Sequence, residues 1–473
     1  MNKTFDRLKK ELKENTDFVF RDIVINNKKI HIIFCETLCN GISINDFIIR
    51  SITSIKSNDL YNEIINKLSS NSIIEKPNYN EMINYLFKGF CIILIDNNCI
   101  AAEVRSKLDK GITSAQNEVS LIGPNEAFTE DFNTNLGLIR KRIRSKNLTC
   151  KSLFLGKETN TKIGICYLKN IANMNLVYKI YRKIEKINID GIIDTGYLRE
   201  IILDKESIFP TTNVTERSDL VAQTLLEGKI AIIVDNSPYV MIIPTFFMDF
   251  FHTPDDYYQK PFNVTFIRII RFISFIIAIF GPAYYISITT HNPESIPIKL
   301  LVNFSAQRLG VPFPGFIEAF IMIICFEILR ESDARTPAKV GTSVSILGGL
   351  VLGSAAVEAG IVSPIMIIVI AISMISGLLF TSNSIIYSIR YFRLILLILS
   401  AFFGLYGVFI GMMLLIIKLT SINTFDLPYT APIAPFIKTE LRDSLIKIKS
   451  KKYRLRNPLL SRNTIRGKNY EDN

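Results

Sequence analysis

Residues 86–104 read LFKGFCIILIDNNCIAAEV, and residues 225–245 read LLEGKIAIIVDNSPYVMIIPT. Each stretch is an apolar run, an Asp-Asn pair and a second apolar run, which is typical of a β-hairpin because Asp and Asn tolerate turn conformations. Three residues of the first stretch recur in the second at one offset, namely Gly89 as Gly228, Asp96 as Asp235 and Asn97 as Asn236.

A weaker repeat lies upstream of each hairpin. KIHIIFC (Lys29–Cys35) resembles KIGICYL (Lys162–Leu168), and a helical pattern follows each of these apolar runs. The alternative is chance similarity between two hairpins, but both flanks agree in order. We therefore expect two tandem α/β subdomains of one plan, at about 26–110 and 150–245. With their flanking segments these are residues 1–110, which open with an amphipathic helix over 1–25, and residues 150–262.

The connection between them, residues 111–149, contains GPNEAFTEDFNTNLGLIRKRI, from Gly123 to Ile143. The sequence predicts a turn at Gly-Pro and a helix capped by Asn125 or Thr129, with a basic C-terminal end that includes Arg140. One interpretation is a connecting helix whose basic end is solvated. The other is an arginine-rich contact to a partner or to acidic groups, and the residues alone favour the solvated end.

The second half of the chain has the composition of a membrane domain. Hydrophobic residues make up 48% of the 473 residues, and charges nearly vanish from four stretches after Phe272. This excludes a plain cytosolic enzyme and a disordered chain. We expect an α-helical membrane domain over 263–420, with 296–335 lying in the interface, re-entering or crossing. The four expected spans are Phe272–Thr290, Val340–Val357, Ile361–Phe380 and Leu394–Ile417.

The C-terminal segment 421–473 is expected to be a basic cytosolic tail. From Lys438 onward eleven basic and four acidic residues give a net charge of +7. The N-terminal stretch has no apolar core of a signal peptide. The positive-inside rule then places both termini in the cytoplasm, which requires an even number of spans.

Two features of the expected membrane domain are chemically unusual. Small residues at Ser345, Gly349 and Gly353 follow one another at i+4, a pattern that permits close helix packing or a narrow pathway. Acidic residues also stand in or beside apolar segments, where burial is costly. Glu327 is expected to pair with Arg330 one turn on. Glu318 and Glu358 have no close helical partner.

The sequence offers no catalytic constellation. It contains no GxxxxGK[ST], GxGxxG, GxSxG or HExxH motif. His31, Cys35 and Cys39 are close in the sequence, but buried apolar cysteines are the commoner explanation of such a run. We expect no enzyme activity, no cofactor, no metal site and no nucleic-acid partner.

The chain resembles the A subunits of GerA-type spore germinant receptors and the related stage V sporulation AF proteins. The resemblance runs from about 110 to 437. The chain departs from the usual pattern at Ile122, Asn125, Ala127 and Ser218, where Arg, Arg, Gly and Pro are common. The family signature residues that it keeps include Gly123, Pro124, Glu126, Glu130, Asn135, Arg140, Arg142, Glu216 and Arg217.

The resemblance implies a multi-pass protein of the spore inner membrane that responds to nutrients and triggers germination. It implies a transporter-like B subunit and a C lipoprotein as partners. It also implies a homo-oligomer, a pentamer, that forms a ligand-gated cation channel among membrane lipids. A non-conducting signalling scaffold and a membrane transporter are the alternatives. We expect the pathway and gate at Ser345, Gly349, Gly353, Val357 and Glu358, because Glu358 would form a ring of carboxylates in an oligomer and Val357 could close an apolar gate.

Overall fold

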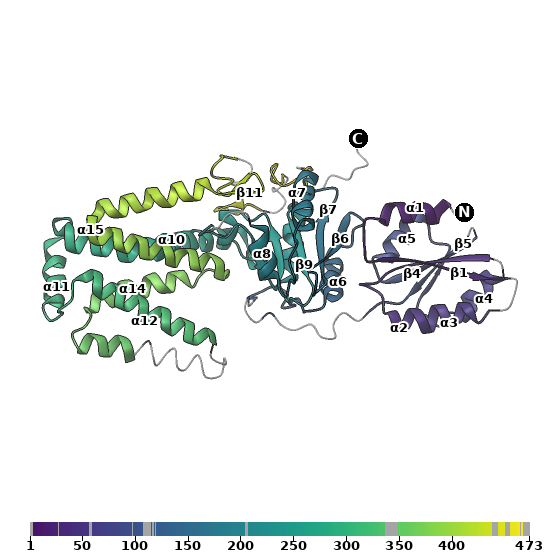
Figure 1. Ribbon diagram of the computed structural model, residues 1–473, viewed down its shortest axis with the longest axis horizontal. Helices are drawn as coiled ribbons and strands as arrows, with labels where there is room; N and C mark the ends of the chain where they lie inside the picture. The colour runs from purple at the N-terminus through teal and green to yellow at the C-terminus, as the bar shows by residue number, and fades with distance from the viewer. Residues whose placement is uncertain are drawn as a thin grey trace. The chain divides into compact units, whose positions relative to one another are not determined.

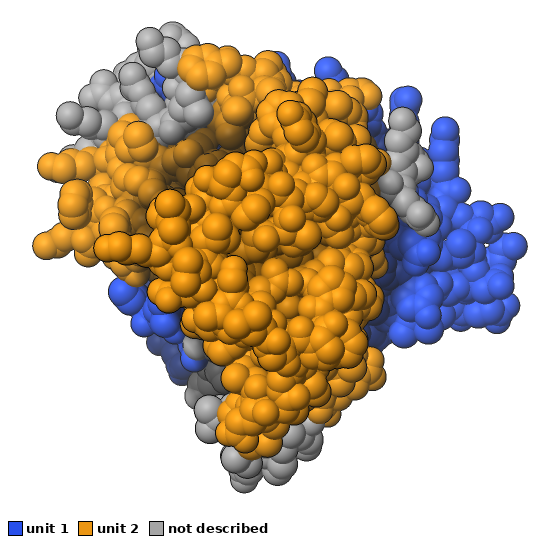
Figure 2. All heavy atoms as spheres, turned by 90° about the vertical axis from the view of Figure 1, so that its left-hand side faces the viewer, with its two compact units in different colours: residues 1–206, 212–245, 450–473 blue, residues 207–211, 246–449 orange. Residues whose placement is uncertain are grey.

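The computed structural model describes two compact units, which Figure 2 distinguishes by colour. Unit 1 comprises residues 1–206, 212–245 and 450–473, and unit 2 comprises residues 207–211 and 246–449. The residues outside the description are 1–2, 27, 56–58, 97, 107–114, 116–117, 119, 204–206, 336–348, 350, 438–442, 450–454, 464 and 467–473.

The first sheet of unit 1 is antiparallel and has helices on both faces (Figure 1). Its strands lie in the order β1-β2-β4-β5-β3. Neighbouring strand residues point to opposite faces, so Ile33 joins a core with α1 and α5, while Ile32 joins a core with η1, α3 and α4. The elements are α1 (Lys3–Leu12), β1 (Phe18–Ile25), β2 (Lys28–Cys35), α2 (Gly41–Ser43), η1 (Ile44–Ile49), α3 (Arg50–Thr53), α4 (Leu60–Lys67), β3 (Ile73–Glu75), α5 (Tyr79–Leu86), β4 (Phe90–Ile95) and β5 (Asn98–Glu103).

The second sheet of unit 1 repeats this strand order as β6-β7-β9-β10-β8. The two hairpins expected from the sequence are β4-β5 and β9-β10, and Asp96 and Asn236 in their turns have φ of 50° and 64°. The common order agrees with the predicted repeat. The elements are α6 (Phe132–Arg142), β6 (Leu148–Leu155), β7 (Thr161–Leu168), α7 (Met174–Glu185), α8 (Thr195–Ile202), β8 (Asn213–Thr215), α9 (Ser218–Leu226), β9 (Ile230–Val234) and β10 (Val240–Ile243).

The N-terminal helix is shorter than expected. It ends at Leu12, and Phe18–Ile25 forms the edge strand β1. Phe5, Leu8 and Leu12 do form the buried face of α1 that their spacing predicts. The prediction assigns the 3.6-residue repeat of a helix to Phe18–Ile25. These residues instead have the two-residue repeat of a strand, because β1 pairs with β2 along its whole length.

The C-terminal segment completes the second subdomain instead of forming a free tail. In the first subdomain the chain that follows β5 closes the fold, since Asn40 N–H donates to Val104 O (2.8 Å) and Ser106 N–H donates to Leu38 O (2.8 Å). In the second subdomain the corresponding donors and acceptors bond residues from the C-terminal segment. Asn173 N–H donates to Leu460 O (3.0 Å), and Arg462 N–H donates to Ile171 O (2.7 Å).

The C-terminal segment passes so close to Gly228 that this position requires a glycine. Its φ is +96°, and a Cβ there would lie 2.9 Å from Leu460 O and 3.2 Å from the Ser461 side chain. Gly89, its counterpart in the first subdomain, has φ +82° and would place a Cβ 3.2 Å from the backbone of Arg105. The repeated glycine therefore marks the place where the closing segment crosses each subdomain.

Unit 2 is helical (Figure 1), and among its described residues two helical stretches are long and apolar enough to cross a membrane. These are Pro261–His291, whose most apolar 18 residues have a mean hydropathy of 2.1, and Asn383–Ser421, where the corresponding value is 2.4. The elements are η2 (Phe247–Phe251), η3 (Pro254–Tyr257), α10 (Pro261–Ile286), η4 (Ser287–His291), η5 (Pro293–Ser295), α11 (Ile298–Arg308), α12 (Gly315–Arg335), α14 (Pro364–Gly377), α15 (Asn383–Ser421), β11 (Asn423–Thr424) and β12 (Leu427–Pro428).

Helix α15 reverses direction at Gly404, whose φ of 57° and ψ of −136° are not helical. A Cβ on Gly407 would lie 2.1 Å from Leu399 O, and one on Gly411 would lie 2.2 Å from the Leu396 side chain. Residues so far apart along one straight helix could not touch, so 405–421 runs back along 383–403 (Figure 1). The prediction of a single span over Leu394–Ile417 is therefore wrong.

The other expected spans differ in outcome. Phe272–Thr290 lies within the long helical stretch that begins with α10. The expected span Ile361–Phe380 contains α14, which has 14 residues and is about 21 Å long at 1.5 Å per residue. Most of Val340–Val357 lies outside the described residues. The ambiguous segment 296–335 forms two helices, α11 and α12, separated at the Pro-Phe-Pro motif that begins with Pro312.

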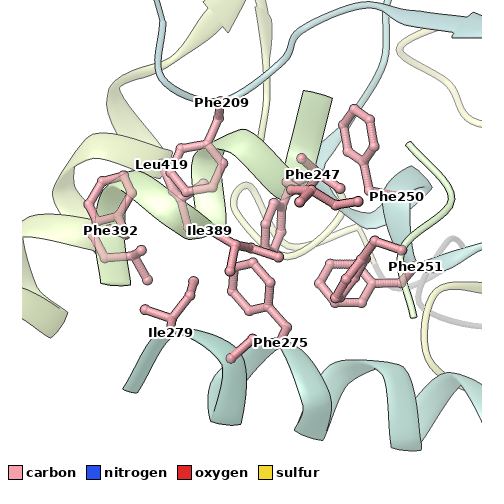
Figure 3. Packing of buried hydrophobic residues seen from close by; sticks show 14 of the residues in the cluster. Phe209, Phe247, Phe250, Phe251, Phe275, Ile279, Ile389, Phe392 and Leu419 are labelled. Carbon is pink, nitrogen blue, oxygen red and sulfur yellow. The ribbon is translucent and has the colours of Figure 1, made fainter. Parts of the chain in front are cut away.

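Aromatic rings fill the core of unit 2 where α10 and α15 meet η2 (Figure 3). Phe247 makes edge contacts with Phe251 and Phe275 at centroid distances of 5.2 and 5.4 Å. Phe209 stacks on Phe392 at 5.2 Å. Offset and edge-on ring pairs of this kind add specific geometry to the apolar burial. They hold the middle of α10 and the first half of α15 on one core.

Candidate functional site

Helix α6 carries the signature residues of the connection, and Asp131 is its N-cap. The Asp131 carboxylate accepts a hydrogen bond from Thr134 N–H (2.6 Å), so the expected caps Asn125 and Thr129 are wrong. The turn of the second hairpin rests on this end of the helix. Asp235 Oδ1 accepts from Phe132 N–H (3.2 Å), and Asn236 N–H donates to Glu130 O (2.9 Å).

Asn135 supports the same contact from inside the helix. Its side chain is fully buried, its Oδ1 accepts from Thr129 N–H (2.7 Å), and its amide group donates to Thr129 O (2.5 Å). Because both ends of the amide are satisfied, the buried polar group holds the loop before α6. Gly123 and Pro124 lie in that loop, outside the helix.

Arg140 is fully buried, so the expected solvated basic end of α6 is wrong. Its Nη2 donates to Asp17 Oδ1 (2.7 Å) and its Nε donates to Asp17 Oδ2. Asn15 accepts a further bond (3.2 Å), and the guanidinium lies 5.2 Å from the ring centre of Phe18. The Asp17 charge holds the pKa of Arg140 above its ordinary value although burial opposes this. The pair joins the first subdomain to the second.

The remaining signature residues form ion pairs beside α6 and α9. Arg142 donates to Glu126 Oε2 (2.9 Å) and to Ser218 Oγ (2.9 Å), so serine at the position where proline is common provides an acceptor. Arg217 holds Asp219 through two hydrogen bonds of 3.0 and 2.7 Å.

A raised carboxylate pKa accompanies these pairs. Glu216 accepts from the Glu118 N–H (2.6 Å), which brings the two acidic residues together. Burial and the charge of Glu216 raise the pKa of Glu118 to about 7, against the lowering effect of the Thr215 hydroxyl. The signature region is therefore a set of buried contacts that tie loop, helix and hairpin together.

A second polar cluster lies at the start of the first long helix of unit 2. Arg268 on α10 is fully buried and donates to Asp256 Oδ2 (3.0 Å) and Asp443 Oδ1 (3.0 Å). Arg271 donates to the Asp256 carboxylate at 2.9 Å. Burial would raise the pKa of Asp256, but Arg271 and Arg268 hold it below its ordinary value. This cluster ties the residues that follow α15 back to the start of α10.

His252 lies beside the same cluster. Its Nε2 is 2.6 Å from Ser444 O, an acceptor, which fixes a proton on that nitrogen. Burial and the charge of Arg268 lower the pKa of His252 to about 4. The imidazole is therefore neutral at neutral pH.

Pro282 interrupts the hydrogen bonds of α10 and exposes one carbonyl to its neighbours. Proline has no N–H, so Ala278 O loses its partner four residues on. Ser373 Oγ from α14 (3.0 Å) and Arg393 Nε from α15 (2.9 Å) donate to this oxygen instead. Three helices thus meet at one buried carbonyl.

The acidic residues of unit 2 have partners that the sequence did not indicate. Glu327 pairs with Arg390 of α15 (2.9 Å) and lies 4.0 Å from Arg393, so the expected pairing with Arg330 is wrong. Glu318 is fully buried and accepts from Ser363 N–H (2.9 Å) and Oγ (2.8 Å) at the start of α14. Arg308 of α11 lies 3.4 Å from the same carboxylate. These partners are distant in sequence, so no helical spacing could reveal them.

The expected pathway residues are partly described. Ser345 lies outside the described residues, and Gly349, Gly353, Val357 and Glu358 lie within them. Residues 351–358 are helical. No described atom lies within 4 Å of a Cβ built on Gly349 or Gly353, and Glu358 is exposed.

The sequence profile of the Bacillus/Clostridium GerA spore germination proteins matches residues 6–459. The chain belongs to the GerA family. Spore germination protein KA of Bacillus subtilis is 36% identical over 94% of this chain and 84% of its own length. Spore germination protein GerQA of Bacillus cereus is 34% identical over 98% of this chain and 93% of its own. The expected resemblance is thereby confirmed.

A solved structure is also similar in sequence to this GerA protein. The N-terminal domain of the A subunit of the Bacillus megaterium germinant receptor GerK3 is 27% identical, covering 51% of this chain and 94% of that one, with a TM-score of 0.38. The GerA chain is a spore germination protein, the A subunit of a germinant receptor. It is a membrane protein, and its family is not one of enzymes.

Proposed function

We propose that copies of this GerA subunit assemble around an axis in the spore inner membrane and form a nutrient-gated cation channel. The helix at 351–358 carries the proposal. On one side, Leu352 and Ala356 pack against the cluster that contains Val362 and Met366. On the other side Val351, Ser354 and Glu358 are exposed. This arrangement leaves the helix face with Val351, Ser354 and Glu358 available to a neighbouring copy.

An oligomer would convert this face into a pathway. A cyclic assembly repeats Glu358 once per subunit, and the resulting ring of carboxylates concentrates cations and repels anions. Val357 is half-buried beside it and would provide an apolar ring that closes by dewetting. The B subunit would bind the nutrient and the C lipoprotein would complete the receptor, with both termini of this chain in the cytoplasm.

Ion flux from liposomes tests the proposal. The purified full chain is reconstituted with potassium inside, and the potassium-to-chloride permeability ratio is measured. We expect Glu358→Gln to lower this ratio several-fold, and Val357→Ala to raise the leak without ligand. Glu331→Gln is the matched control, because Glu331 is exposed on α12 and pairs only with Arg335 among the described residues (2.7 Å).

Two results would contradict the channel. In one, Glu358→Gln and Val357→Ala assemble normally and conduct like the parent, which would place the pathway elsewhere. In the other, the parent carries no current while B and C subunits co-purify with it. The chain would then be a signalling scaffold.

A further inference from the structure

Two arginines of unit 2 approach a single carboxylate, and a third stands one helical turn away from it. Arg390 and Arg393 approach Glu327 from α15 at 2.9 and 4.0 Å. Arg330 stands one turn after Glu327 on α12, and among the described residues it forms no hydrogen bond or salt bridge. Glu331, the next acidic residue, is bound to Arg335. The cluster therefore carries more positive than negative charge.

The inner and outer members of this cluster have different surroundings. Arg393 is 3% exposed and is used inside the unit, where it donates to Ala278 O. Arg390 and Glu327 keep about a quarter of their side chains exposed, at 24% and 22%, and Arg330 is half-buried. The open side of the cluster is thus formed by Arg330 and Arg390.

Exposed apolar and aromatic side chains are sequence neighbours of these arginines on α12 and α15. Ile328 is 63% exposed, Tyr387 is 53% exposed and Tyr391 is 60% exposed. The Arg390 guanidinium lies 5.1 Å from the centre of the Tyr387 ring. Tyrosine beside arginine and exposed isoleucine is the pattern of a helix surface at the level of lipid headgroups. Unpaired positive charge at that level attracts anionic lipid.

We propose that Arg330 and Arg390, supported by Arg393, bind the phosphate of a phospholipid headgroup. A guanidinium presents two N–H groups in a plane that match two phosphate oxygens, whereas an ammonium cannot. One phosphodiester would offset a unit of the excess charge, and its acyl chains would lie along Ile328. The site joins α12 to α15, so a bound lipid stabilises the contact between these helices. This inference does not depend on ion conduction.

Thermal unfolding of the delipidated full chain in detergent tests the site. Dioctanoyl phosphatidylglycerol, dioctanoylglycerol and inorganic phosphate are added separately, and the midpoint temperature is measured. We expect phosphatidylglycerol to raise the midpoint by several degrees and dioctanoylglycerol, which has no phosphate, to leave it unchanged. If inorganic phosphate alone raises it equally, the phosphate chemistry stands and the source is a free anion.

The variant Arg330→Gln/Arg390→Gln should lose more than half of the phosphatidylglycerol shift. Lys299→Gln/Lys418→Gln, which removes two exposed cations of unit 2 elsewhere, should keep it. If the glutamine variant does not fold, Arg330→Lys/Arg390→Lys keeps the charge and should still weaken the lipid response several-fold because the planar fork is lost.

Three results would overturn the proposal. They are equal responses to phosphatidylglycerol and dioctanoylglycerol, a full shift in the glutamine or lysine variant, and loss of a co-purified partner subunit from the glutamine variant while its lipid response stays intact. The last result would assign the cluster to an acidic protein surface.

Discussion

Arg140 is buried because a carboxylate 123 residues earlier in the chain neutralises it. Helix spacing indicated correctly that Arg140 lies near the end of α6, but it could not indicate the partner, because Asp17 belongs to the other subdomain. The same holds for Glu318 and Glu327, whose partners lie on other helices. At the scale of residues, the sequence identified which side chains are unusual, and only the folded chain identified their contacts.

The burial of His252 makes the free energy of unfolding depend on pH. Its folded pKa of about 4 is below the ordinary value of 6.5, so the unfolded chain binds a proton first as the pH falls. The neutral His252 side chain therefore contributes to the free energy of unfolding above pH 6.5. This contribution is lost as the pH falls toward 4, and at pH 5 the free energy of unfolding is lower by about 2 kcal/mol.

We expect the midpoint of thermal unfolding to fall between pH 7.5 and pH 5 by several degrees more in the parent than in His252→Gln, which cannot titrate. His291→Gln is the matched control, because His291 also bonds a carbonyl, Ala401 O at 2.8 Å, but is exposed. An identical pH response of parent and His252→Gln would show that another group is responsible.

The hairpins and the long helices were predictable to different degrees. The hairpins could be read from the sequence because turn residues and apolar alternation repeat at one offset. The reversal in α15 could not, because 394–417 is uniformly apolar and Gly404, Gly407 and Gly411 resemble ordinary small residues of a membrane helix. Only the folded chain shows that Gly407 and Gly411 allow the two halves of α15 to approach each other closely.

A side chain at Gly407 would clash with the opposite half of α15. A Cβ there would lie 2.1 Å from the backbone oxygen of Leu399, which cannot rotate away. We expect Gly407→Ala to cost about 1–3 kcal/mol and to lower the midpoint of thermal unfolding by several degrees. Gly281→Ala is the matched control, since its Cβ would meet no described atom closer than 3.7 Å. Equal midpoints for the two variants would refute the close approach of the two halves of α15.

At the scale of the whole chain, the repeat was predictable and its completion was not. The sequence showed two copies of one plan, but the second copy lacks a closing segment next to its hairpin, because the chain continues into unit 2 after Thr245. The missing piece is 460–462, which no local pattern connects with Gly228. The basic charge of the C-terminal segment favoured a solvated tail, whereas Arg466 pairs with Glu227 and Leu460 is 2% exposed.

Amide hydrogen exchange on the full chain tests this docking. Leu460→Asp should speed exchange at the Asn173 N–H, which bonds Leu460 O, by at least tenfold. The Asn40 N–H, which makes the corresponding bond to Val104 O in the first subdomain, should keep its rate. Leu455→Asp changes an exposed leucine of the same segment and should leave both rates unchanged. Unchanged exchange at Asn173 in Leu460→Asp would contradict the docking.

The docking of 460–462 sets an order of events during synthesis. A ribosome makes β6 to β10 early, then the whole of unit 2, and only afterwards the residues that close the second subdomain. Until translation nears its end, Ile171 O and Asn173 N–H lack their hydrogen-bond partners, because residues 460–462 have not yet been synthesised. A nascent chain that stops inside unit 2 therefore carries an open second subdomain, which a protease or chaperone can distinguish from the closed subdomain of the finished chain.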